Sequence, residues 1–238
     1  MKNQYFGDIN DYYKYGLLRA LLRPASMDLL VGWMLTPDEG STDGRKTSYL
    51  DRPDRYRSLD PELFDFLSRA VQNDQRRGVS AIEETGLLPR ASYFSRFIPD
   101  GRNERSGYFD ALLSMGGDII FFDPDNGLEI KSKDRGHKSS SKYLFFDEVQ
   151  RTWSSGRSVL IYQHFPRVGH EAYTKSRLQD LRRITSGPWI SSVRTSHVLF
   201  LLAAQPEHAP PLEAGIEEVR ESWGREFKEV QVLQPVEL

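Results

Sequence analysis

The stretch that decides the fold lies in the middle of the chain and reads Asp118-Ile119-Ile120-Phe121-Phe122-Asp123-Pro124-Asp125-Asn126-Gly127-Leu128-Glu129. Its apolar first half is a short continuous run, which is typical of a strand buried on both faces of a parallel sheet. Its second half is rich in Asp, Asn, Pro and Gly, the residues that favour a tight turn. We therefore expect a central strand over residues 118–122 that passes directly into a polar turn.

Other apolar runs alternate with helical patterns along the rest of the chain. We expect strands over residues 29–35, 93–98 and 158–162, two more within 189–204, and helices over 12–22, 60–71, 104–115, 142–154, 171–184 and 212–223. This alternation predicts an α/β fold with a mostly parallel, doubly wound sheet and helices on both faces. The last strands, with an extended stretch over 227–233, are expected to form a C-terminal antiparallel edge. A single α/β domain over residues 1–238 is predicted.

The composition excludes several kinds of site. The 238 residues include no cysteine, which rules out disulfides, thiolate nucleophiles and cysteine-held metal centres. A formal net charge of -2 provides no global positive field for nucleic acid, but it leaves room for a local basic patch. No stretch approaches the roughly 18 apolar residues of a membrane helix. We expect a soluble, cytoplasmic protein with no membrane partner, and the oligomeric state stays open.

The candidate site follows the central strand, because ligands of open α/β sheets bind at the carboxyl ends of the strands. Asp123, Asp125 and Glu129 bring three carboxylates together within seven residues, with the amide of Asn126 among them. These oxygens suit Mg²⁺ or Mn²⁺, or a substrate amine. The alternative is a turn in which the same side chains only satisfy backbone donors.

Further candidates lie at other strand ends and in nearby loops. His164 follows the strand over 158–162, where it is a candidate base, metal ligand or substrate contact. The basic loop over residues 131–142 predicts phosphate contacts. The polar loop over residues 41–58 is a candidate lid. We expect substrate contacts from Lys131 and Lys138 of the basic loop, from Arg167 after the 158–162 strand, and from Tyr5 and Lys14 near the N terminus.

The order of elements resembles that of Rossmann-like class I methyltransferases, in particular the bacterial rRNA adenine N6-methyltransferases. The segment over residues 5–15 is similar to the family's entry segment, and Ile119 to Pro124 resembles the strand and the beginning of its Asp-Pro-Pro-Tyr motif. The resemblance implies that Asp123 and the carbonyl of Pro124 hold a target amine. Asp125 and Asn126 replace the family's Pro-Tyr pair, so the aromatic residue that stacks on the base must come from another position.

The resemblance also implies S-adenosylmethionine as cofactor, bound after the first strand by Thr36, Asp38 and Gly40. The turn that contains these residues does not have the family's usual glycine-rich sequence.

Three functions are therefore compatible with the sequence. The first is a methyltransferase-like protein that acts on nucleic acid or a nucleotide, with the target held by the Asp123-Pro124 turn. The second is a metal-dependent nuclease or phosphohydrolase with Asp123, Asp125 and Glu129 as Mg or Mn ligands, because Pro124-Asp125 followed by Glu129 and Lys131 is similar to a P-D…E-x-K signature. The third is a non-catalytic nucleic-acid-binding protein on a decayed enzyme fold.

Overall fold

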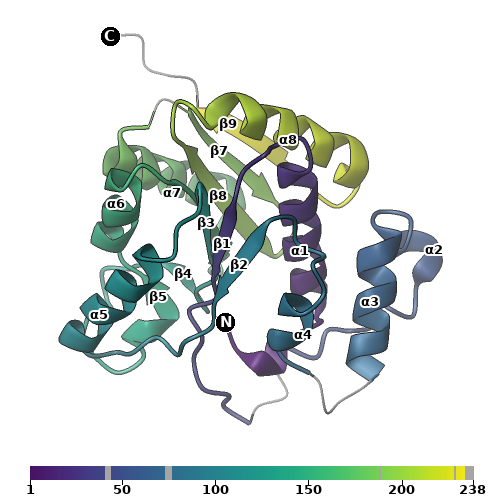
Figure 1. The fold of residues 1–238 in the computed structure, drawn as a ribbon, viewed down its shortest axis with the longest axis horizontal. Helices are drawn as coiled ribbons and strands as arrows, with labels where there is room; N and C mark the ends of the chain where they lie inside the picture. The colour runs from purple at the N-terminus through teal and green to yellow at the C-terminus, as the bar shows by residue number, and fades with distance from the viewer. Residues whose placement is uncertain (41–43, 73–76, 188, 228, 234–238) are drawn as a thin grey trace.

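The centre of the molecule is a sheet of seven strands (Figure 1). The computed structural model describes residues 1–40, 44–72, 77–187, 189–227 and 229–233. From edge to edge the strands are β2 (Ala91–Phe94), β1 (Leu29–Gly32), β3 (Ile119–Phe122), β6 (Ser158–His164), β8 (Val198–Ala204), β7 (Trp189–Arg194) and β9 (Glu229–Leu233).

Five of these seven strands point the same way. β1 pairs in parallel with β2 and β3, and β3 pairs in parallel with β6. β8 is antiparallel to β6 and β7 is antiparallel to β8, so β7 again follows the direction of β6, while β9 opposes it. The predicted mostly parallel sheet with a C-terminal antiparallel edge is confirmed, and the fold is Rossmann-like.

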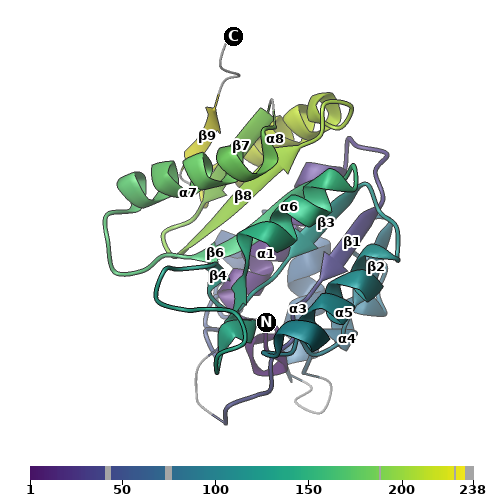
Figure 2. The same ribbon diagram turned by 90° about the vertical axis from the view of Figure 1, so that its left-hand side faces the viewer.

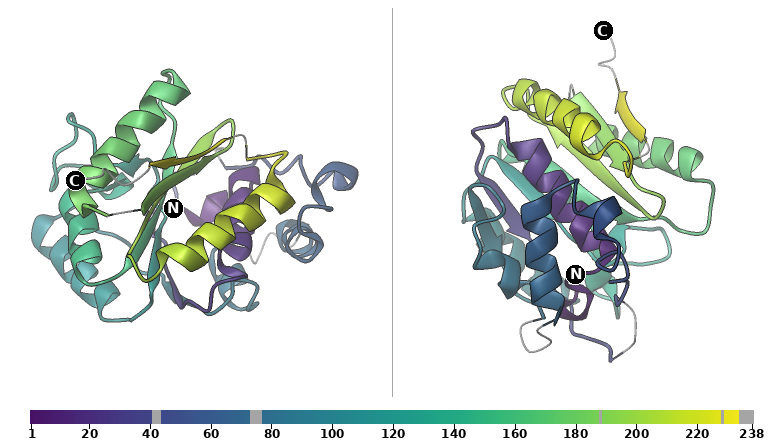
Figure 3. Two further views of the ribbon diagram at one scale, coloured as in Figure 1. Left: turned by 90° about the horizontal axis from the view of Figure 1, so that it is seen from above. Right: turned by 90° about the vertical axis from the view of Figure 1, so that its right-hand side faces the viewer.

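Helices cover both faces of the sheet, as expected for a doubly wound arrangement. One face carries α5 (Arg102–Leu113), α6 (Phe146–Ser154) and α7 (His170–Thr185), which lie in front of the strands in Figure 2. The opposite face carries α1 (Ile9–Leu22), α3 (Pro61–Gln72), α4 (Ser80–Glu83) and α8 (Ala209–Trp223), seen in Figure 3. The short α2 (Pro53–Tyr56) lies beside α3. No helix among the described residues is long and apolar enough to span a membrane.

Side-chain alternation along the strands builds a separate hydrophobic cluster on each face. In β3, Ile119 and Phe121 join the cluster under α1, α3 and α8, whereas Ile120 and Phe122 join the cluster under α5, α6 and α7. All four side chains are fully buried. A strand with core on both faces must be apolar at every position, which is why its sequence is continuous rather than alternating.

The region after β3 differs from the prediction in one element. The helix expected from residue 142 begins at Phe146, after η3 (Ser140–Lys142) and β5 (Tyr143–Leu144). β5 pairs in parallel with β4 (Gly127–Leu128), and this pair forms a small second sheet. The helix begins there because Glu148 accepts a hydrogen bond from the backbone N–H of Phe145 at 2.9 Å.

The expected lid region contains short structured pieces. α2 lies within it, and the N–H of Ile9 donates to the carbonyl of Lys46 at 3.1 Å, so residue 46 is held against the beginning of α1. Residues 41–43 of the predicted lid lie outside the described residues. Closure of this loop over a ligand stays a prediction.

Candidate functional site

A pocket of about 400 Å³ opens at the carboxyl ends of β3 and β6. The connection from β1 leads to β2 on one side, whereas β3 and β6 lie on the other, so the chain reverses its strand order beside β1. Such a reversal leaves a crevice in which ligands of this fold bind. Its lining comprises Met1, Tyr5, Asp8, Asn10, Asp11, Lys14, Gly44, Lys46, Asp123, Pro124, Asp125, Asn126, Lys142, Tyr162, His164 and Phe165.

A buried ion-pair network joins α1 to the turn after β3. The Nζ of Lys14 lies 2.6 Å from Oδ2 of Asp123 and 2.7 Å from Oδ1 of Asp11. Asp11 and Lys14 share one face of α1 because they are three residues apart. Burial raises the pKa of Asp123, and the Lys14 ammonium limits that rise. Burial alone would lower the pKa of Lys14, but the two carboxylates raise it, so the amine is charged at neutral pH.

Asp8 caps the first turn of α1 at the edge of the pocket. Its side chain accepts hydrogen bonds from the N–H groups of Asn10 at 2.8 Å and Asp11 at 3.0 Å. Burial raises the pKa of Asp8 to about 7, and the negative charge of Asp11 makes a smaller contribution in the same direction. The carboxyl group of Asp8 therefore changes its charge close to neutral pH.

Asn10 presents an unused hydrogen-bond acceptor at this pocket. The side chain is only 8% exposed, and its Oδ1 has no hydrogen-bond partner within the described chain. A buried polar atom without a partner costs roughly 1–3 kcal/mol, and a ligand that donates to it removes that cost.

Aromatic side chains from two separate regions line the same pocket. Tyr5 comes from η1 (Asn3–Tyr5), and Tyr162 and Phe165 come from β6 and the residues after it. The Nζ of Lys14 lies 4.9 Å from the centre of the Tyr162 ring. Phe165 stacks on the ring of His170 with a centroid separation of 3.9 Å, which fixes the orientation of Phe165.

His164 lies at the mouth of the pocket. Its Nε2 is 3.1 Å from the hydroxyl of Tyr162. Loss of hydration, together with the charge of Lys14, lowers the pKa of His164 to about 4. The imidazole is therefore neutral at neutral pH.

The Asp125 side chain pairs with other protein groups on the β1 side of the pocket. Its carboxylate accepts a hydrogen bond from the Thr36 hydroxyl at 2.7 Å and lies 2.7 Å from the ammonium of Met1. Burial opposes the charge, but the Met1 ammonium, Thr36 and Lys2 together lower the pKa of Asp125. The ammonium of Met1 also lies 2.8 Å from the carbonyl oxygen of Asp123. Residues 1 and 2 therefore border the crevice between β1 and β3.

Glu129 is engaged away from the pocket. Its Oε2 accepts a hydrogen bond from the N–H of Phe146 at 2.9 Å, at the beginning of α6. Asp123, Asp125 and Glu129 thus have three different partners. Within the described ranges, no group of three or more Asp, Glu or His side chains is arranged to hold a metal ion. The predicted metal ligand set therefore gains no support from the geometry.

The turn between β3 and β4 is held by Gln163 of β6. The Gln163 amide accepts from the N–H of Leu128 at 2.8 Å and donates to the carbonyl of Asn126 at 2.9 Å. Gly127 has a φ of +113°, and a Cβ there would lie 2.3 Å from the Gln163 amide. Only glycine fits this position, so the amide clamp fixes the Asp123-Pro124 turn in place.

The other predicted residues divide between the pocket and its surroundings. Tyr5, Lys14, Asn126 and His164 line the pocket, and their contacts to a substrate stay a prediction. The side chains of Lys131, Lys138 and Arg167 are exposed and lie outside its lining. Lys142, which belongs to the same basic loop, reaches the pocket and pairs with Glu39 at 2.6 Å.

The predicted cofactor residues also lie outside the pocket lining. Thr36 is buried against Asp125, the carboxylate of Asp38 accepts from the N–H of Gln4 at 3.2 Å, and Gly40 is exposed. These three residues therefore do not form a common binding surface in this pocket.

Several pocket residues were absent from the predicted site, among them Asn10, Tyr162 and Lys46. The four-residue spacing of Asn10 and Lys14 was a signal that they share a helix face. No local signal indicates that this face meets the end of β3, because the two segments are more than 100 residues apart in sequence.

The fold and the pocket together define a Rossmann-like α/β protein with a polar, aromatic-walled pocket at the point of strand reversal. No family model matches the chain, and no curated protein matches it. Among solved structures, the chain is similar to a crystal structure of a Legionella pneumophila protein that bears the family-model name DUF519. The two share 12% identity over 98% of each chain, with a TM-score of 0.47.

Proposed function

We propose that this chain is an S-adenosylmethionine-dependent methyltransferase that acts on an exocyclic amino group of a base in nucleic acid or a nucleotide. The observation that carries the proposal is the placement of Asp123 and Pro124. They follow β3 directly, line the pocket at the strand reversal, and begin a turn that resembles the Asp-Pro-Pro-Tyr motif. The methyltransferase family itself is part of this proposal.

The acceptors around Asp123 suit an amino group. The carbonyl of Pro124 accepts no hydrogen bond from another described residue, and the Asp123 carboxylate is held in position by Lys14 at 2.6 Å. An amino group donates two N–H bonds, so these two oxygens can hold it in a fixed orientation. Hydrogen bonds to both N–H groups increase the electron density on the nitrogen that must attack the methyl carbon.

The aromatic side chains of the pocket supply the stacking surface that position 126 lacks. Tyr5 and Phe165 both line the pocket, although they lie far apart in the sequence. Stacking of a base on an aromatic side chain contributes about 1–3 kcal/mol. A base held by Asp123 and Pro124 can therefore stack on one of these rings, although the tyrosine of the family motif is missing.

S-adenosylmethionine is better accommodated by this pocket than by the turn after β1. S-adenosylmethionine, when bound, supplies an electrophilic methyl group. The unpartnered Oδ1 of Asn10 and the carboxyl of Asp8 can accept from its ammonium and hydroxyl groups. Thr36, Asp38 and Gly40 do not fit this role, because open space surrounds Gly40 and the other two have protein partners.

The experiment combines calorimetry with transfer of a labelled methyl group to RNA or DNA. We expect the wild-type protein to bind S-adenosylmethionine saturably and to label the nucleic acid. Asp123→Ala is expected to retain cofactor binding and to lose transfer by about 100-fold, the size of effect typical when one preorganised polar group is removed. Asp38→Ala, which removes a carboxylate outside the pocket, is the control and should behave as wild type.

A nucleic-acid-binding protein without methyl transfer is the second candidate. The segment after β1 favours this candidate, because residues 35–40 are not glycine-rich and do not resemble a phosphate or cofactor loop. Binding of oligonucleotides without calorimetric binding of S-adenosylmethionine would support this candidate and contradict methyl transfer. The nuclease proposal predicts cleavage that chelators abolish, and the partners of Asp125 and Glu129 count against its ligand set.

A further inference from the structure

A second pocket, of about 380 Å³, lies beside the first and is not used by the proposed reaction. It is formed by the beginning of α1, by the residues leading into and through α2, by the turn between β7 and β8, and by the end of α8. Lys46, Arg52, Arg55 and Arg225 are among the residues that line it.

The two pockets meet across the first turns of α1. Asn10 and Lys14 line the first pocket, whereas Ile9 and Tyr13 line the second. The two residues of each pair are four positions apart, so each pair forms a stripe along α1, and the two stripes are adjacent. Lys46 lines both pockets and therefore stands between them.

The second pocket carries a concentrated positive charge. Lys46, Arg52, Arg55 and Arg225 contribute four positive charges, and Glu226 is the single carboxylate in its described lining. Four minus one leaves a local charge of +3, in a chain whose formal net charge is -2. The excess therefore belongs to this surface and does not reflect a generally basic protein.

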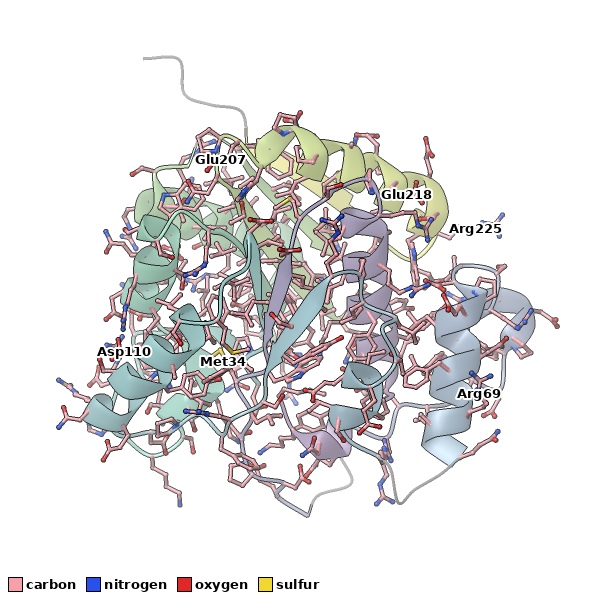
Figure 4. All side chains as sticks on the ribbon, viewed as in Figure 1. Met34, Arg69, Asp110, Glu207, Glu218 and Arg225 are labelled. Carbon is pink, nitrogen blue, oxygen red and sulfur yellow. The ribbon has the colours of Figure 1, made fainter. Side chains whose placement is uncertain are left out.

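Three of the four cations are available to a ligand. The Glu226 carboxylate is occupied by the hydroxyl of Tyr13 at 2.7 Å and by Arg55 at 2.9 Å. Lys46, Arg52 and Arg225 form no ion pair with a carboxylate in the part of the chain that the structure describes. Figure 4 shows Arg225 beyond the end of α8, on the side of the molecule where α2 lies.

The remaining polar groups suit phosphate rather than a carboxylate-bearing protein partner. Ser48, Thr195 and Ser196 place hydroxyl groups among the cations. Arg, Lys, Ser and Thr side chains supply many of the contacts that proteins make to nucleic-acid phosphates. Tyr13, Tyr49 and Tyr56 also line the pocket, but their side chains are buried within the protein. The surface open to a ligand therefore offers mainly charge and hydrogen-bond donors rather than the aromatic anchors of protein interfaces.

We propose that the second pocket binds backbone phosphates of a nucleic-acid strand whose target nucleotide enters the first pocket. This inference rests on the proposed function and narrows it, because a free nucleotide would need only one pocket. Lys46 then contacts the phosphate next to the target nucleotide, and Arg52 and Arg225 contact phosphates further along the strand. The substrate is accordingly a polynucleotide.

The test measures binding of a fluorescent single-stranded 12-mer, as RNA and as DNA of equal sequence, by anisotropy over a range of KCl concentrations. We compare the wild-type protein with R52Q/R225Q. A single-strand phosphate contact contributes about 0.7 to the slope of log K against log salt. The slope is negative, so the double variant should make it shallower by about 1.4 and weaken binding of unrelated sequences to the same extent.

The control variant is R69Q/K175Q, which removes the same charge from exposed positions on α3 and α7 outside both pockets. It should leave the slope and affinity close to wild type. Thermal unfolding of all three proteins verifies that the surface substitutions leave the fold intact. Similar behaviour of RNA and DNA indicates phosphate recognition alone, and a preference for RNA adds a contact to the 2′-hydroxyl.

The outcomes separate this proposal from the proposed function. Equal slopes for wild type and R52Q/R225Q, an equal loss in R69Q/K175Q, or no binding by wild type would each overturn the phosphate site. If slope and affinity fall only in R52Q/R225Q while S-adenosylmethionine fails to bind, the phosphate site stands and methyl transfer does not. If methyl transfer proceeds equally well in R52Q/R225Q and in wild type, the function stands and the phosphate site does not.

Discussion

Lys14 is the residue on which the charge balance of the pocket depends. It is 2% exposed and pairs with both Asp11 and Asp123. Removing one partner of a buried ion pair leaves an uncompensated charge and typically costs about 3–5 kcal/mol. We expect Lys14→Gln to lower the free energy of unfolding by about that amount in urea titrations, whereas the exposed Lys138→Gln should change it by less than about 0.5 kcal/mol. A loss below about 1 kcal/mol in Lys14→Gln would contradict the burial of this network.

The titration of Asp8 makes a second prediction at this scale. Its pKa in the folded protein is about 7, against an ordinary value of 3.8. The folded state therefore binds a proton that the unfolded state releases, and this contribution to stability is lost as pH rises from about 4 to 7. Asp8→Asn removes the titration but keeps a good N-cap for α1.

Urea titrations of wild type and Asp8→Asn between pH 4.5 and 8 test this. Relative to wild type, the variant should gain stability as pH rises, and the difference should level off above pH 7. A difference that does not vary with pH would show that Asp8 titrates normally. Other carboxylates titrate in both proteins, so their contributions cancel in the comparison.

The sequence identifies the turn after β3 but not the residues with which its side chains pair. Asp123 and Pro124 are recognisable because an apolar strand and a turn are both local patterns. The role of Asp125 was not recognisable, because its partners Thr36 and Met1 are about 90 or more residues away. Carboxylates that are adjacent in sequence resemble a metal site until their separate partners are known.

At the scale of elements, the packing of α8 on α1 depends on a close backbone approach. A Cβ at Gly215 of α8 would lie 2.0 Å from the carbonyl oxygen of Leu21 in α1, and a backbone atom cannot move aside easily. Gly215→Ala should therefore destabilise the protein by about 1–3 kcal/mol, although alanine is the better helix former. Chemical denaturation measures this change.

Gly107 of α5 provides the matched control. It is exposed, and a Cβ there would meet nothing within 4 Å. Gly107→Ala should stabilise the protein by up to about 1 kcal/mol through helix propensity alone. If both substitutions changed the free energy of unfolding in the same direction, the close approach of α8 to α1 would be contradicted.

Most elements could be predicted because their patterns are local, and α6 shows where this fails. The hydrophobic pattern near residue 142 extends into β5, so the apolar positions do not mark the beginning of the helix. That position is set by Glu148 at the N–H of Phe145 and by Glu129 at the N–H of Phe146. The second contact comes from the turn after β3, which no pattern within the helix can reveal.

For the whole molecule, we expect a single cooperative unfolding transition. The two hydrophobic clusters lie on opposite faces of the same strands, so neither can lose its packing without exposing part of the other. Differential scanning calorimetry should give one transition with equal calorimetric and van't Hoff enthalpies. Two resolved transitions, or a van't Hoff enthalpy well below the calorimetric one, would contradict the predicted single domain.

The unoccupied acceptor at Pro124 has a consequence for which bases the proposed enzyme can use. The Pro124 carbonyl accepts no hydrogen bond from the residues that the structure describes, so it favours a base edge that offers N–H, as adenine and cytosine do. A carbonyl at the same place would set lone pairs against lone pairs, and sites of this kind can reject such analogues by about 10⁴-fold or more. Deamination of the target base would thus turn a substrate into a molecule that the pocket excludes.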